Sequence, residues 1–74
     1  MHRYGVILFK KSSVALQVEM RLQEAGFSVA MIPVPREISD DCGVSVRFDW
    51  DDLERIDALL RRLEVETDGV SLLE

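Results

Sequence analysis

Apolar and polar positions change their period along the chain, and each change marks a predicted element. The run Tyr4–Phe9 is continuously apolar and rich in β-forming residues, which predicts a central strand covered on both faces. A helix is expected next, because apolar residues recur at helical spacing in Val14, Val18, Leu22 and Ala25. We expect Ser12 or Ser13 to cap this helix and Gly26 to end it.

An alternating pattern with a period of two residues predicts two further strands. Residues 27–32 form the first of these, and Pro33 ends it because proline cannot donate a hydrogen bond to a ladder. Residues 44–49 form the next strand, with one apolar and one polar face. The segment PVPREISDDCG, residues 33–43, connects the two strands, which we expect to pair as a hairpin.

The remainder of the chain predicts a second helix and a last strand. Asp51 followed by Glu54 resembles a capping box. Helical spacing continues to about Glu64 through Leu53, Ile56, Leu60 and Leu63. Residues 70–73, VSLL, are long enough for a short final strand.

The order β-α-β-β-α-β predicts a single α+β domain over residues 1–74. We expect the ferredoxin-like arrangement, with two helices on one face of an antiparallel sheet. A right-handed crossover makes the first two strands parallel, with the third inserted between them. Lys10 to Ser13 and Arg36 to Gly43 would then share one edge of the sheet.

Charge and composition exclude several classes of partner. The net charge is −5 and the pI about 4.7, so broad attraction to nucleic acid or to anionic lipid is not expected. The sequence has no phosphate-binding glycine motif, and we expect Gly5, Gly26, Gly43 and Gly69 to mark turns. The opening apolar stretch Val6–Phe9 is too short for a signal sequence or a membrane span, which favours a cytoplasmic protein.

The single cysteine, Cys42, lies in polar company that is unusual for a buried residue. It cannot form an internal disulfide. A helix N-terminus and the nearby Lys11 would lower the pKa of its thiol, whereas Asp40 and Asp41 would raise it. We expect net activation of the thiolate, and the alternative is that Cys42 is a packing residue. Gly43 would leave room beside the sulfur.

Residues 9–48 carry a family resemblance. The matching positions are Phe9, Ser12, Ala15, Glu19, Leu22, Pro33, Pro35, Arg36, Ser39, Cys42 and Gly43. This pattern, with P-x-P-R followed by Cys-Gly, is similar to that of the selenium/sulfur carrier protein-like domain family of short bacterial proteins. The resemblance implies a persulfide or perselenide carried on Cys42, a donor protein such as a cysteine desulfurase, and an acceptor protein.

Within that hypothesis we assign roles to the residues around Cys42. Arg36 and the start of the first helix, with Lys11, Ser12 and Ser13, would bind the cargo and stabilise negative charge on sulfur. The carrier would need no cofactor and no metal, and would not be an enzyme in its own right.

A different hypothesis is a regulatory or interaction module in which Cys42 is structural. Both alternating sets of the first strand, Tyr4/Val6/Leu8 and Gly5/Ile7/Phe9, are largely apolar, and two helices can cover only one face of the sheet. The other face could pack against a second subunit and give a homodimer, or against a partner protein. An independent enzyme is disfavoured, because His2 is the only histidine and lies near the chain terminus. The carboxylates Asp40, Asp41, Asp49, Asp51 and Asp52 are best interpreted as loop solvation and helix capping.

Overall fold

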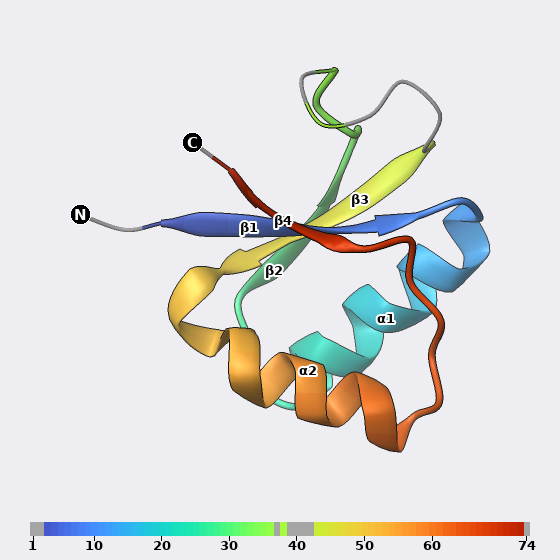
Figure 1. The fold of residues 1–74 in the computed structure, drawn as a ribbon. Helices are drawn as coiled ribbons and strands as arrows, with labels where there is room; N and C mark the ends of the chain where they lie inside the picture. The colour runs from blue at the N-terminus through green and yellow to red at the C-terminus, as the bar shows by residue number, and fades with distance from the viewer. Residues whose placement is uncertain (1–2, 37, 39–42, 74) are drawn as a thin grey trace.

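Four strands and two helices follow one another in the predicted order in a computed structural model, which describes residues 3–36, 38 and 43–73. The elements are β1 (Tyr4–Phe9), α1 (Ser12–Glu24), β2 (Val29–Ile32), β3 (Val44–Asp49), a short 3-10 helix (Trp50–Asp52), α2 (Leu53–Arg62) and β4 (Val70–Leu73). The chain therefore has an α+β architecture built on one four-stranded sheet (Figure 1).

The strands lie in the order β2-β3-β1-β4, and every neighbouring pair is antiparallel. Because β3 is antiparallel to both β1 and β2, those two strands are parallel with β3 between them, as the sequence predicted. The register pairs Phe9 at the end of β1 with Val44 at the start of β3. On its other side β1 pairs with β4, from Tyr4 opposite Leu73 to Ile7 opposite Val70.

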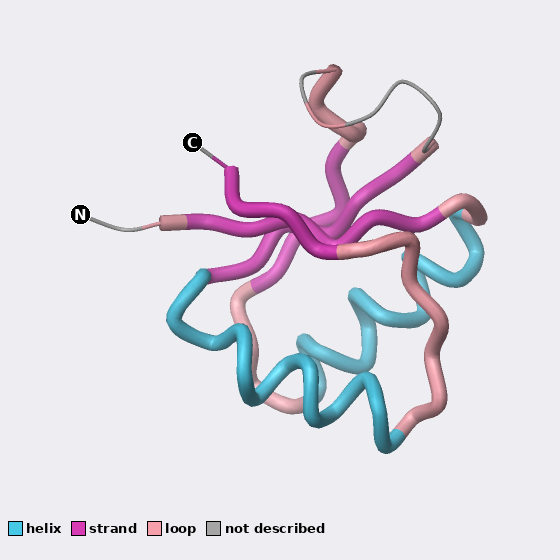
Figure 2. Tube along the Cα trace, in the orientation of Figure 1, coloured by secondary structure: helices cyan, strands magenta, loops and turns pink. Residues whose placement is uncertain are grey.

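Both helices pack on the same face of the sheet (Figures 1 and 2). Alternate residues of β1 and β3 point toward them and supply the buried core from the strand side. The buried core comprises Ile7, Phe9, Ala15, Val18, Leu22, Val46, Phe48, Ile56 and Leu60. Neither helix, within the residues that the structure describes, has the length and apolar character needed to cross a membrane.

The opposite face of β1 differs from the expectation that it offers apolar surface to a partner. Val6 and Leu8 are only 0% and 7% exposed, so they are already buried within the chain. Tyr4 is 39% exposed, and the guanidinium of Arg47 lies 4.9 Å from the centre of its ring. Of the set Tyr4, Val6 and Leu8, which lies on the face away from the helices, only Tyr4 is accessible to a second subunit.

Gly5 does not mark a turn, contrary to the sequence prediction, because it lies inside β1. A Cβ atom at this position would come within 2.6 Å of Trp50 and 2.7 Å of Phe48. Those two rings are stacked with their centres 5.9 Å apart and cross the strand where Gly5 has no side chain. Gly26 and Gly69, by contrast, lie in connections and have positive φ angles.

The second strand begins two residues later than predicted. The chain leaves α1 in a Schellman motif, in which the amide of Gly26 donates to the carbonyl of Gln23 at 3.0 Å. The amide of Phe27 donates to the carbonyl of Leu22 at 2.9 Å. Phe27 therefore completes the end of the helix, and β2 begins only at Val29.

Candidate functional site

The site begins where β1 ends and α1 starts, at the exposed residues Lys10 to Ser13. Lys11, rather than Ser12 or Ser13, is the N-cap of α1, because the amide of Ala15 donates to the carbonyl of Lys11 at 3.2 Å. The two serines are instead the first two helical residues. The predicted serine cap was therefore wrong by one or two residues.

This change of cap has an electrostatic consequence. A lysine side chain carries only donors, so it cannot accept from the first amides of the helix, and no side-chain capping bond is formed. The first turn of α1 also contains no acidic residue. The positive end of the helix is therefore not neutralised by its own first turn, and Lys11 adds a further positive charge beside it.

The base of the β2–β3 connection is fixed next to this point. Ile32 and Ser45 are register partners at the end of the hairpin, and the Ser45 hydroxyl, fully buried, donates to the Ile32 carbonyl at 3.1 Å. Gly43 follows the connection, and among the described residues a Cβ atom placed on it would meet only the carbonyl of Lys10, at 3.9 Å. The topology thus brings Gly43 beside the β1–α1 junction.

Arg36 is placed less closely. It is exposed and lies in a turn in which the amide of Ile38 donates to the carbonyl of Pro35 at 3.0 Å. The described parts of this connection extend away from the two helices (Figure 1). No hydrogen bond joins Arg36 to Ser12 or Ser13 in the part of the chain described. Cys42, with residues 37 and 39–41, lies outside the described residues.

A segment that the sequence analysis did not connect with the site lies on the other side of β1. The amide of Asp68 donates to the carbonyl of Leu8 at 2.8 Å, which holds the α2–β4 connection beside the end of β1. Together they form a hollow of about 320 Å³, lined by Phe9, Lys10, Lys11, Val14, Glu66, Thr67 and Asp68. The sequence predicts a last strand, and antiparallel pairing of that strand with β1 would have placed this segment beside the end of β1.

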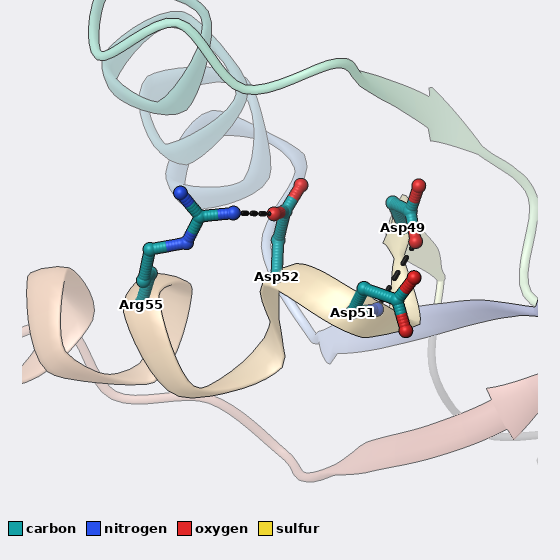
Figure 3. A network of polar contacts seen from close by, with 4 residues as sticks. All are labelled: Asp49, Asp51, Asp52 and Arg55. Atoms are coloured by element: carbon teal, nitrogen blue, oxygen red, sulfur yellow. Dashed lines mark hydrogen bonds and ion pairs between the residues drawn. The ribbon is translucent and has the colours of Figure 1, made fainter.

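The carboxylates near the start of α2 have structural roles (Figure 3). Asp49 accepts from the amide of Asp51 at 3.0 Å and so caps the short 3-10 helix. The predicted capping box made Asp51 the cap of the second helix, whereas the N-cap of α2 is Asp52, whose side chain makes no capping bond. Asp52 forms an ion pair with Arg55. Over residues 3–36, 38 and 43–73, no three His, Cys, Asp or Glu side chains are grouped in a way that could hold a metal ion.

The geometry therefore surrounds the end of β1 with three chain segments. The start of α1 supplies lysine side chains and uncapped amides, which suit a negatively charged group. Gly43 supplies space at the hairpin side, and the α2–β4 connection supplies Glu66 and Asp68 on the other side. The lysines and helix amides favour a negatively charged group at this site, whereas Glu66 and Asp68, which line the same hollow, oppose one.

Comparison with known proteins yields one family. Residues 4–71 match the family described as "Putative Se/S carrier protein-like". Neither the curated proteins nor the solved structures contain a match. The matched range includes β1, β2, β3, both helices and the first half of β4, as well as the P-x-P-R and Cys-Gly segments.

Proposed function

The chain belongs to the Se/S carrier protein-like family, and from this premise we propose that it carries sulfur or selenium on Cys42 as a persulfide or perselenide. We assign the frame that presents this residue to the ferredoxin-like group, on the basis of its strand order. The observation that carries the proposal is the approach of Gly43, the chain neighbour of Cys42, to the start of α1.

The proposed loading step is an exchange between two sulfur centres. The Cys42 thiolate attacks the terminal sulfur of a donor persulfide, and a new S–S bond forms as the S–S bond of the donor breaks. The donor cysteine leaves as a thiolate with the electron pair of the broken bond, so the exchange needs no external oxidant or reductant. An acceptor nucleophile then takes the terminal sulfur in the same way and restores the Cys42 thiolate.

The charges near α1 support this step. Loading requires the thiolate form of Cys42, and a positive charge near the sulfur favours that form. Lys11 and the uncapped amides at Ser12 and Ser13 lie at the junction that Gly43 approaches. We propose that they stabilise the thiolate and the carried anion, and that Arg36 makes the same kind of contact from the opposite side of the connection.

Gly43 has a separate role in this proposal. The Cys42 thiolate must attack the terminal sulfur of the donor persulfide in line with the S–S bond of the donor, which requires an unobstructed path for the donor toward Cys42. Among the described residues that are not its chain neighbours, none lies closer than 3.9 Å to the position that a Cβ atom at residue 43 would take. A large residue such as leucine would occupy that space, and we propose that glycine is present to leave it free for the donor.

The experiment is a loading assay read by mass spectrometry. The protein is incubated with a cysteine desulfurase and cysteine, and in a parallel arm with selenocysteine as the source of selenium. Digestion then locates the added atom. We expect one added sulfur or selenium on the peptide containing Cys42, no addition in Cys42→Ser, and slower loading in Lys11→Gln.

A matched control removes the same charge at the other end of β1. Arg3 is exposed and lies just before β1, so Arg3→Gln should load at the wild-type rate. Absence of any adduct, while the same desulfurase loads a known carrier, would overturn the proposal. In that case the interaction-module hypothesis, in which Cys42→Ser has no consequence, would be preferred.

A further inference from the structure

The edge strands of the sheet are β2 and β4. They differ in whether the backbone amides and carbonyls that point away from the sheet have hydrogen-bond partners. The amide of Leu8 donates to the carbonyl of Gly69 at 2.9 Å, so these residues form a hydrogen-bonded pair in the antiparallel ladder. Such pairs recur at every second residue. Ser71 and Leu73 therefore turn their amides and carbonyls toward β1, and Val70 and Leu72 turn theirs away from the sheet.

The same alternation of inward and outward backbone groups holds along β2. The amide of Trp50 donates to the carbonyl of Arg3 at 2.9 Å, which fixes the hydrogen-bonded pairs between β1 and β3. The alternate residues of β3 then pair with Ala30 and Ile32. Val29 and Met31 consequently direct their amides and carbonyls outward from the edge.

On β2 these outward groups already have partners from α1. The carboxylate of Glu19 accepts from the amide of Met31 at 2.7 Å, and the side-chain amide of Gln23 donates to the carbonyl of Val29 at 3.4 Å. Glu19 and Gln23 are one helical turn apart, so a single face of α1 covers the edge. A further strand cannot pair with β2 without displacing these side chains.

On β4 no described residue covers the outward groups in this way. Among the described residues, none donates to or accepts from the outward backbone groups of Val70 and Leu72. The Val70 side chain is 41% exposed. Of the two edges of this sheet, β4 is therefore the one that can accept another strand.

We propose that two copies of the chain associate by antiparallel pairing of their β4 strands about a two-fold axis. Ser71 would lie at the axis, and Val70 would form a hydrogen-bonded pair with Leu72 of the partner subunit. The same two residues would meet again on the other side of the axis. This places an apolar Val–Leu contact on the helix-facing side of both copies.

The difference between the edges favours a second copy of this chain as the partner. A sheet with two open edges would continue to add copies and form a fibre. Here each copy has one open edge and one covered edge, so pairing stops at two. The contact is short and each copy has a net charge of −5, so we expect a weak dimer that becomes stronger as salt screens the repulsion. This inference does not depend on Cys42.

The test combines sedimentation equilibrium with amide hydrogen exchange, over a range of protein concentrations. We expect a monomer–dimer equilibrium whose dimer fraction increases with salt. The amides of Val70 and Leu72 should become protected as the dimer forms, whereas protection at Met31 should not change. Leu72→Pro removes an outward donor and leaves the β1 ladder intact, so it should weaken the dimer by about tenfold or more.

A second variant guards against a folding defect in the proline substitution. Val70→Lys keeps the backbone and places a positive charge opposite Leu72 of the partner subunit, and it should also weaken the dimer. Thermal unfolding and circular dichroism establish that both variants are folded. A wild-type chain that stays monomeric at all concentrations, or a dimer that both variants leave unchanged, would overturn the proposal.

Discussion

Gly5 shows how one residue without a side chain can be required inside a strand. The stacked rings of Phe48 and Trp50 occupy the space where its Cβ would lie, at 2.7 and 2.6 Å. A contact of that length cannot be accepted without displacing an aromatic ring in the core. Glycine is ordinarily unfavourable in a strand interior, and here the packing of two aromatic rings offsets that cost.

We predict that Gly5→Ala lowers the free energy of unfolding by about 1–3 kcal/mol, the usual cost of overpacking a core. Urea denaturation followed by circular dichroism measures this change. Gly43→Ala is the matched control, because among the described residues its added Cβ meets only the Lys10 carbonyl, at an ordinary contact distance of 3.9 Å. Equal stability of the two variants would contradict the role assigned to the Gly5 site.

At the scale of single residues, the sequence indicates which residues are unusual better than it indicates what each residue does. The polar surroundings of Cys42 are visible in the sequence and indicate a candidate site within residues 33–43. The need for glycine at position 5 is not visible, because it arises from Phe48 and Trp50, which reach Gly5 only through the pairing of β1 with β3. A packing requirement of this kind arises only when the fold brings distant segments together.

The type and order of the elements follow the apolar pattern closely, but several of their ends differ from the prediction. β1, β3 and β4 have the predicted bounds. The errors lie where a hydrogen bond from a neighbouring residue decides the boundary, as at Phe27, Lys11 and Asp49. Several residues near each end can cap a helix, so the sequence pattern does not distinguish among them.

In the turn that precedes α2, Asp49, which makes a capping bond in the 3-10 helix, can be compared with Asp51, which the sequence predicts as the cap of the second helix. Asp49 accepts from the amide of Asp51, so Asp49→Ala should cost about 0.5–2 kcal/mol of stability. Asp51→Ala removes a carboxylate that makes no such capping bond and should cost less. Thermal unfolding of the two variants measures the difference, and a larger loss for Asp51→Ala would restore the capping box that the sequence predicted.

At the scale of the whole molecule, topology gathers the site from three separate segments. The parallel relation of β1 and β2 follows from the β-α-β order, and it brings the hairpin end beside the start of α1. That part could be predicted from the sequence. The contribution of Glu66 and Thr67 could not, since it depends on β4 pairing with β1 on the side away from β3.

The covered and open edges are also properties of the whole chain. Glu19 and Gln23 look like ordinary surface residues of an amphipathic helix in the sequence. Their bonds to Met31 and Val29 depend on how α1 lies along β2, which no local pattern specifies. The fold thus protects one edge with a helix that the carrier hypothesis uses at its other end.

The thiol pKa of Cys42, read from the pH dependence of its alkylation rate, tests the carrier hypothesis most directly. A positive charge favours the thiolate, so we predict a pKa clearly below the value of about 8.5 for a free cysteine. Lys11→Gln should raise the pKa, and Arg3→Gln should leave it unchanged. A wild-type pKa at or above about 8.5, with no response to Lys11→Gln, would contradict the account.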